Sequence, residues 1–112
     1  MMSNLEQKKC MPCEGITAPL SKKHSEFLLD NLSDDWELSN NNQEIKRTFK
    51  FIDFLSAMSF VKKCGDVAEN EGHHPDLNLH NYNKVTVTLS THAISGLSEN
   101  DFILATKIDN LN

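Results

Sequence analysis

The sequence lacks the features of membrane proteins and of secreted, disulfide-rich proteins. It has no run of about 18 apolar residues, so no transmembrane helix is predicted. Lys8 and Lys9, near the start, are not followed by the apolar stretch of a signal peptide. The 3 cysteines are an odd number that does not make a disulfide framework. We therefore expect a cytoplasmic protein with reduced thiols.

Positive charge is also scarce. The chain has 11 Lys and Arg against 16 Asp and Glu, which gives a net charge of -5. Nucleic acids and anionic membranes are bound through clustered positive charge, so neither is an expected partner. The length of 112 residues fits one domain. We place this domain at residues 20–112, after an irregular arm over residues 1–19 that contains Pro12, Gly15 and Pro19.

Three stretches have the pattern of helices. Ser21 is a suitable N-cap for the first, which ends near residues 31–35. Asp53 caps the second, which runs to about Asn70 and ends before Gly72 and Pro75. Ser98 caps the third. The apolar residues predicted to be buried are Phe27, Leu28 and Leu32 in the first helix, Phe54, Met58, Val61, Gly65 and Ala68 in the second, and Phe102, Ala105 and Ile108 in the third.

Four stretches have the pattern of strands, over residues 36–38, 44–51, 77–81 and 84–91. Arg47 is the exception on the apolar face of the second. Turn residues separate the last two and predict a hairpin. The expected fold is therefore α+β, with a four-stranded antiparallel sheet, three helices packed on one face and the order α-β-β-α-β-β-α. Because the open edges of such a sheet favour pairing with another copy, we expect a homo-oligomer.

The hairpin places three of the 5 histidines together. A turn centred near Asn83 pairs index 74 with index 92, because opposite residues of antiparallel strands have a constant index sum. His73, His74 and His92 are thus predicted to converge at one end of the sheet. Such a cluster suits a three-imidazole metal site or metal-free acid–base chemistry, with a polar loop of no function as the third interpretation. The neighbours His73 and His74 point to opposite faces, which favours acid–base chemistry.

Four segments of the chain closely resemble the pterin-4a-carbinolamine dehydratases, in bacterial form. They are Glu-Asn-Glu-Gly-His-His-Pro at 69–75, Tyr-Asn-Lys-Val at 82–85, Leu-Ser-Thr-His at 89–92 and Gly-Leu-Ser-Glu-Asn-Asp at 96–101. The resemblance covers about residues 20–110 and implies the same α+β fold, as a homodimer or homotetramer. It also implies dehydration of 4a-hydroxytetrahydropterin to quinonoid dihydropterin and water. That reaction belongs to tetrahydrobiopterin recycling after aromatic amino acid hydroxylation.

The resemblance also implies roles for individual residues. His73 and His92 would be the acid/base pair, and His74 would hold the pterin at its hydroxylated carbon. Glu69 would orient an imidazole, although a solvated carboxylate at the helix end is as good an interpretation. No metal and no organic cofactor is implied. The positions implied to bind substrate are Glu69, Gly72, Ser90 and Thr91.

Two rival functions are a protein-interaction role and a zinc-binding module. Animal members of the family act as dimerisation cofactors for a homeodomain transcription factor. The bacterial-looking arm argues against that partner and favours a regulatory contact with phenylalanine hydroxylase. Zinc binding by Cys10 and Cys13 would need a second pair of ligands that is not evident. The remaining chemically distinctive residues are expected to be structural or solvated: Cys64, Trp36, His24 and His80.

Overall fold

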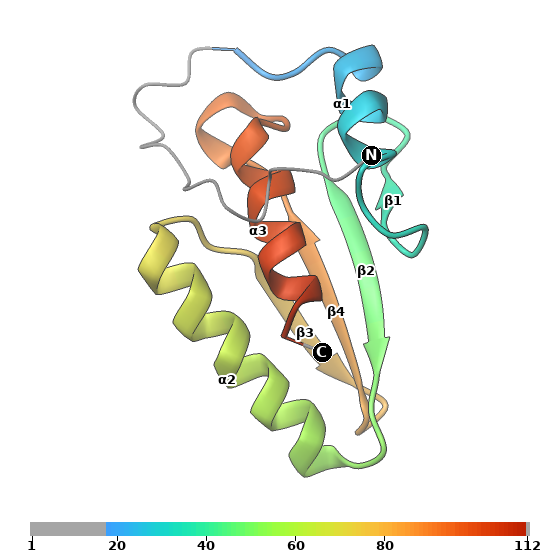
Figure 1. Ribbon diagram of the computed structural model, residues 1–112, viewed down its shortest axis with the longest axis vertical. Coiled ribbons are helices and arrows are strands. Elements are labelled where there is room, and N and C mark those ends of the chain that lie inside the picture. Colours follow the sequence, from blue (N-terminus) through green and yellow to red (C-terminus); the bar gives the residue numbers. More distant parts are fainter. Residues whose placement is uncertain (1–17, 112) are drawn as a thin grey trace.

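A computed structural model describes residues 18–111 and confirms the α+β fold and the predicted element order (Figure 1). The predicted arm falls almost wholly outside the described residues, as do Cys10 and Cys13. The elements are α1 (Lys22–Leu29), β1 (Glu37–Leu38), β2 (Ile45–Lys50), α2 (Phe54–Glu71), β3 (Asp76–His80), β4 (Lys84–Leu89), the 3-10 turn η3 (His92–Ile94) and α3 (Glu99–Asp109).

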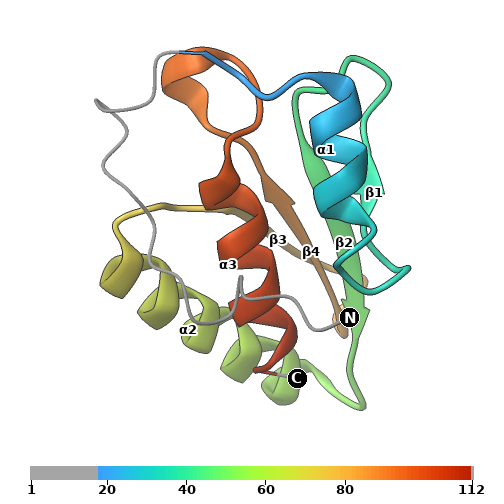
Figure 2. The ribbon, with the colours of Figure 1, turned by 45° about the horizontal axis from the view of Figure 1, so that its top comes forward.

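The four strands form one antiparallel sheet in the order β1-β2-β4-β3. The helices lie on one side of it (Figures 1 and 2). Alternation along β4 explains this arrangement, because Val85, Val87 and Leu89 are fully buried while the residues between them are only partly covered. The sheet therefore has a covered face that packs on the helices and an outer face without a helix.

The predicted hairpin between β3 and β4 is present, but its turn centre was wrong by one residue. His80 pairs with Lys84, which centres the turn at Tyr82 rather than at Asn83. Asn81 and Tyr82 both adopt left-handed backbone angles, with φ of 49° and 57°. Such angles give the turn a twist that matches the flanking strands, and they set the register. Residues that lie opposite each other therefore have residue numbers with the same sum as His80 and Lys84. His74 then falls opposite Ser90 instead of His92.

The buried stripe of helix α2 matches the predicted one only in part, because Ala68 is buried and Val61 packs against the core as predicted. The buried residues are Ala57, Phe60, Cys64 and Ala68, whereas Phe54 and Met58 are about half exposed. Small side chains at Ala57 and Cys64 let the helix approach the sheet closely, and hydropathy alone does not identify them. Cys64 is a core residue, as predicted, and burial raises the pKa of its thiol to about 12. Among residues 18–111, no helix is both long and apolar enough to cross a membrane.

The predicted helix caps explain where the helices begin and end. The side chain of Ser21 accepts a hydrogen bond from the backbone of His24, and that of Asp53 accepts one from Ser56. The hydrogen bonds that Ser56 makes to the Asp53 carboxylate lower the pKa of Asp53. Gly72 ends α2 with a left-handed φ of 69°, a conformation that glycine adopts without strain. This turn directs the chain from α2 into β3.

Arg47, the exception in the strand pattern, joins a polar cluster at the end of α3. Its guanidinium donates to Asp109 at 2.8 Å and lies 4.2 Å from the centre of the Phe49 ring. The indole N–H of Trp36 donates to the same carboxylate at 3.0 Å. Trp36 is therefore a core residue, as expected. Desolvation raises the pKa of Asp109, and the Trp36 and Arg47 contacts only partly oppose this effect.

The raised pKa of Asp109 predicts a pH dependence of stability. The folded protein binds a proton at this carboxyl more tightly than the unfolded chain does. The stability that this group contributes is therefore lost as pH rises above the ordinary value of 3.8 and through the folded pKa. Asp109→Asn removes the titration. We expect the free energy of unfolding of wild type minus that of D109N, measured by chemical denaturation, to fall as pH rises above 3.8.

Asp53 supplies a control of opposite sign. Its pKa is lowered in the folded state. The free energy of unfolding of wild type minus that of D53N should therefore rise with pH over the acidic range. Asparagine is also a good N-cap, so the helix start is retained. If the two free-energy differences changed with pH in the same direction, the opposite pKa shifts assigned to Asp109 and Asp53 would be contradicted.

Candidate functional site

The predicted site residues lie in two connections at one end of the sheet. The α2–β3 connection carries His73 and His74, and the β4–α3 connection carries Ser90, Thr91 and His92. Because β3 and β4 are antiparallel, the start of one lies beside the end of the other (Figure 1). Extending their register places His73 opposite Thr91 and His74 opposite Ser90.

A buried carboxylate connects these segments on the covered side of the sheet. Asp101, in the first turn of α3, is 0% exposed. Its Oδ1 lies 2.7 Å from Nε2 of His73, and its Oδ2 accepts from the Thr91 hydroxyl at 2.9 Å and from the Ser98 backbone N–H at 3.0 Å. The hydroxyls of Thr91 and Ser98 are 2.7 Å apart. Every one of these groups is buried, so Asp101 satisfies three donors that have no access to water.

This network fixes the orientation of the His73 ring. Oδ2 of Asp101 already accepts two hydrogen bonds, and we assign Oδ1 as an acceptor as well, with the ring proton on Nε2. The partner of one ring nitrogen determines which tautomer is present. Nδ1 of His73 is then the nitrogen that remains for another molecule. The side chain of His73 is 6% exposed, so its position is set by packing as well as by the hydrogen bond.

His74 points to the other side of the chain, as the alternation of neighbouring side chains predicts. Its Nε2 is hydrogen-bonded to a carboxylate oxygen of Glu69, in the last turn of α2. Both side chains are more than half exposed. The sequence left two interpretations of Glu69, and the geometry is compatible with both, because the carboxylate contacts His74 and is also largely exposed to solvent. Gly72, between the two residues, ends the helix so that this approach is possible.

His92 and Ser90 line an open cavity of about 240 Å³. The segment that carries them is held by backbone hydrogen bonds between Thr91 and Gly96, with Thr91 N donating to Gly96 O at 2.7 Å. Ser95 adopts a left-handed φ of 53° that closes the turn. Gly96 admits no side chain, since a Cβ there would lie 2.6 Å from the Pro19 ring. His92 is exposed at the start of the turn. The other lining residues are Gln43, Glu44, Ser95 and Gly96.

The predicted site residues therefore form three connected groups. They are His73 with Thr91 through Asp101, His74 with Glu69, and His92 with Ser90 around the cavity. Within residues 18–111, no three His, Cys, Asp or Glu side chains are arranged to hold a metal ion. His80 is only partly exposed and is hydrogen-bonded to Thr86, so the expectation that it is simply solvated was wrong.

Asp101 is the residue that sequence reasoning did not include in the site. It was noted only as an acidic residue in the first turn of a helix, favourable to the helix dipole. The available signal was its position three residues after Ser98, where a side chain reaches back to the N-cap. Nothing in the local sequence showed that the same carboxylate reaches His73, 28 residues away.

Replacing Asp101 should destabilise the fold more than replacing its exposed neighbour Glu99. Asp101→Asn replaces one carboxylate oxygen by an NH2 donor, which faces either His73 or the pair Thr91 and Ser98 and leaves the buried donor there without an acceptor. We expect a loss of about 1–3 kcal/mol in the free energy of unfolding. Glu99→Gln removes a charge from the same helical turn and should cost less than about 1 kcal/mol. Chemical denaturation measures both, and equal losses would show that Asp101 acts only through the helix dipole.

Comparison with known proteins identifies the family of this chain. Residues 18–111 match the protein family described as pterin 4 alpha carbinolamine dehydratase. A relative from Alkaliphilus metalliredigens, whose name assigns it to that family, is 44% identical over 108 residues, which is 96% of each chain. A relative from Legionella pneumophila with the same family name is 45% identical over 111 residues, which is 99% of this chain and 97% of the relative.

Solved structures give the same result. A protein from Brucella melitensis, described as a transcriptional coactivator/pterin dehydratase, has a TM-score of 0.76 and 34% identity, covering 83% of this chain and 97% of that one. A pterin dehydratase-like RuBisCO assembly factor has a TM-score of 0.60 and 21% identity, covering 70% of this chain and 90% of that one, and shares the fold. The family match over residues 18–111 and the relatives at about 45% identity show that this chain belongs to the pterin-4a-carbinolamine dehydratase family, whose named members are hydro-lyases.

Proposed function

We propose that this protein dehydrates 4a-hydroxytetrahydropterin by histidine acid–base catalysis, as a step in tetrahydrobiopterin recycling. The observation that carries the proposal is the buried Asp101 carboxylate, which holds His73 at 2.7 Å at the sheet end where His92 lines a cavity. An oriented imidazole with one free nitrogen is the arrangement that proton transfer needs. The family membership shown above supports the same reaction.

The reaction consists of two proton movements around one bond cleavage. The C4a–O bond breaks, and an acid gives the departing hydroxyl a proton so that it leaves as water. The proton on N5 passes to a base, and its electron pair forms the C4a–N5 double bond of quinonoid dihydropterin. One proton is given and one is taken, so the total number of protons on the protein is unchanged, and transfer of a proton from the base back to the acid, directly or through water, restores the starting state. Two imidazoles can supply both steps, since the pKa of imidazole is about 6.5.

His73 and His92 are the acid/base pair in this mechanism. Nδ1 of His73 faces the substrate because Nε2 is bound to Asp101. His92 acts from the cavity that it lines together with Ser90. In this proposal, Ser90 and the backbone around Thr91 contact the pterin ring. His74, oriented by Glu69, holds the pterin at its hydroxylated carbon. The two C4a stereoisomers present their hydroxyl to opposite faces, so the acid and base roles exchange between them. This chemistry requires no metal or organic cofactor.

The mechanism predicts a large loss of activity when either imidazole is removed. His73→Ala and His92→Ala should each slow dehydration by about 10²–10⁴-fold relative to wild type. His24→Ala is the matched control, because His24 is exposed and belongs to none of the three groups. The rate is measured by the absorbance of quinonoid dihydropterin in an assay coupled to phenylalanine hydroxylase. A wild-type protein that does not exceed the uncatalysed rate would disprove the proposed function.

The same assay separates catalysis from a protein-interaction role. A regulatory partner such as phenylalanine hydroxylase would bind through a surface and would not need the imidazoles. Co-purification that survives in the His73 and His92 variants, with no acceleration by wild type, would therefore favour the interaction role.

We also propose that the protein forms a homodimer or homotetramer through the start of α2. Ile52, Phe54, Leu55 and Met58 are large apolar side chains left exposed there, with Ile52 at 88% and Leu55 at 77%. A contiguous exposed apolar patch of this kind marks an interaction site. Further along the same helix, a Cβ added at Gly65 would meet no other atom within 4 Å, so a second helix has room to approach.

Charge introduced into this patch should shift the protein toward monomers. Met58→Glu would bury a carboxylate between copies, and we expect the mass measured by light scattering to fall by at least half at equal concentration. Lys63→Glu, at an exposed position on a different face of the same helix, is the control. An unchanged mass for M58E would place the interface elsewhere.

A further inference from the structure

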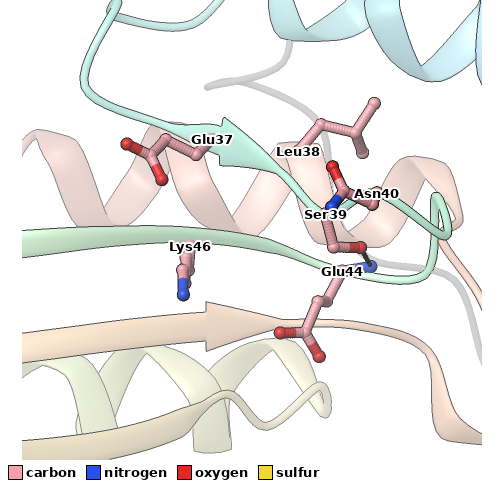
Figure 3. A pocket seen from close by; sticks show the side chains of 6 residues that line it. All are labelled: Glu37, Leu38, Ser39, Asn40, Glu44 and Lys46. Carbon is pink, nitrogen blue, oxygen red and sulfur yellow. Dashed lines mark hydrogen bonds between the residues drawn. The ribbon is translucent and has the colours of Figure 1, made fainter.

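Glu44 lies between two cavities on the outer side of the sheet end. It lines the cavity of His92 and Ser90, and it also lines a second cavity of about 320 Å³ formed by Glu37, Leu38, Ser39, Asn40 and Lys46 (Figure 3). The register of β2 and β4 explains this position, because Ile45 pairs with Leu89 and the preceding residue Glu44 therefore falls opposite Ser90. Glu44 is thus the residue just before β2, far in the sequence from the histidines, yet it shares a wall of the His92 cavity.

The backbone of Glu44 is fixed while its carboxylate is left unpaired. Its N–H donates to the Ser39 hydroxyl at 3.1 Å, and its carbonyl accepts from Ser39 N at 2.9 Å. The Ser39 hydroxyl also accepts from Gln43 N. The turn is therefore held by its own hydrogen bonds and does not use the acid. In the part of the chain that the structure describes, the Glu44 carboxylate has no hydrogen bond or ion pair, and Figure 3 shows it pointing away from the turn.

A half-buried carboxylate beside a cavity is suited to a ligand with two adjacent donors. Its two oxygens accept in parallel, and charge-assisted bidentate pairs of this kind are among the stronger hydrogen bonds. The 2-amino-4-oxopyrimidine ring of a pterin carries two donors side by side, N3–H and the 2-amino group. The other side chains at this cavity that can donate a hydrogen bond belong to Gln43, Ser90, His92 and Ser95. Among its side chains, Glu44 is the only carboxylate.

We propose that Glu44 binds the 2-amino-4-oxopyrimidine edge of the pterin and so selects pterins over 2-oxo analogues. The inference rests on the proposed function, because it uses the same cavity and the same substrate. Glu44 is a binding residue in this proposal, and it takes no part in proton transfer. Binding that edge in the cavity directs C4a, two bonds away from N3, toward the imidazoles.

Two substitutions test the proposal by their effects on turnover. Glu44→Ala should raise KM for 4a-hydroxytetrahydropterin by about 10- to 100-fold, the range for a hydrogen bond to a charged group, with a smaller change in kcat. Glu37→Gln is the matched control, because Glu37 lines the second cavity but not the His92 cavity, and the KM of this variant should stay within about twofold of the wild-type value. An unchanged KM in E44A would overturn the inference.

The preference of the protein for pterin over lumazine gives a second readout. A general loss of folding in a variant would weaken the binding of both ligands and would not change this preference. Lumazine has a 2-oxo group in place of the 2-amino group of pterin. Binding of each compound is measured by the change in its own fluorescence. Wild type should prefer pterin. Glu44→Gln offers one acceptor and one donor, which match N3–H and the 2-oxo group of lumazine, so the preference should be lost or reversed. An unchanged preference in E44Q would overturn the inference.

The two proposals fail in different ways. If wild type accelerates dehydration and the His73 and His92 variants do not, while E44A and E44Q behave as wild type, only the role of Glu44 is disproved. If wild type gives no acceleration, the proposed function is disproved, and the assignment of Glu44 to a pterin falls with it.

Discussion

The candidate site depends on one buried carboxylate, that of Asp101. It accepts hydrogen bonds from His73 in the α2–β3 connection, from Thr91 in the β4–α3 connection and from Ser98, the N-cap of α3. A buried carboxylate is stable only when its lone pairs are occupied, so these three segments must come together for the fold to form. The energetic need to satisfy Asp101 therefore also positions His73. Stability and the orientation of the candidate catalytic imidazole have the same physical origin.

The sheet register divides the remaining groups between two sides. His73 and Thr91 face the helices, where they are buried. His74, together with the cavity side chains Ser90 and Glu44, belongs to the other set of alternating positions. The end of the sheet thus separates a buried proton-transfer group from polar groups open to solvent. A substrate that reaches both must lie across the ends of the strands, beside the turn that begins at His92.

Helix α3 has a buried or half-buried carboxylate at each end, and the two behave differently. Asp101 lies at the N-terminus, where backbone N–H groups and the helix dipole favour a negative charge. Asp109 lies at the C-terminus, where the dipole opposes the charge, and desolvation raises its pKa despite Arg47 and Trp36. The first carboxylate holds the candidate site together. The second joins α3 to β2, through Arg47, on the far side of the core.

The sequence by itself determined the element order, the helix caps at Ser21, Asp53 and Ser98, and the family, because capping and alternation depend on neighbouring residues. It also indicated that His73 and His74 point apart, since alternation is a local property. Only the tertiary structure decided the α2 stripe, the turn centre at Tyr82 and the contact of Asp101 with His73. These depend on how closely small residues let elements approach, on backbone angles that two turn residues share, and on a hydrogen bond between distant segments. Such long-range contacts leave no periodic signal in the chain.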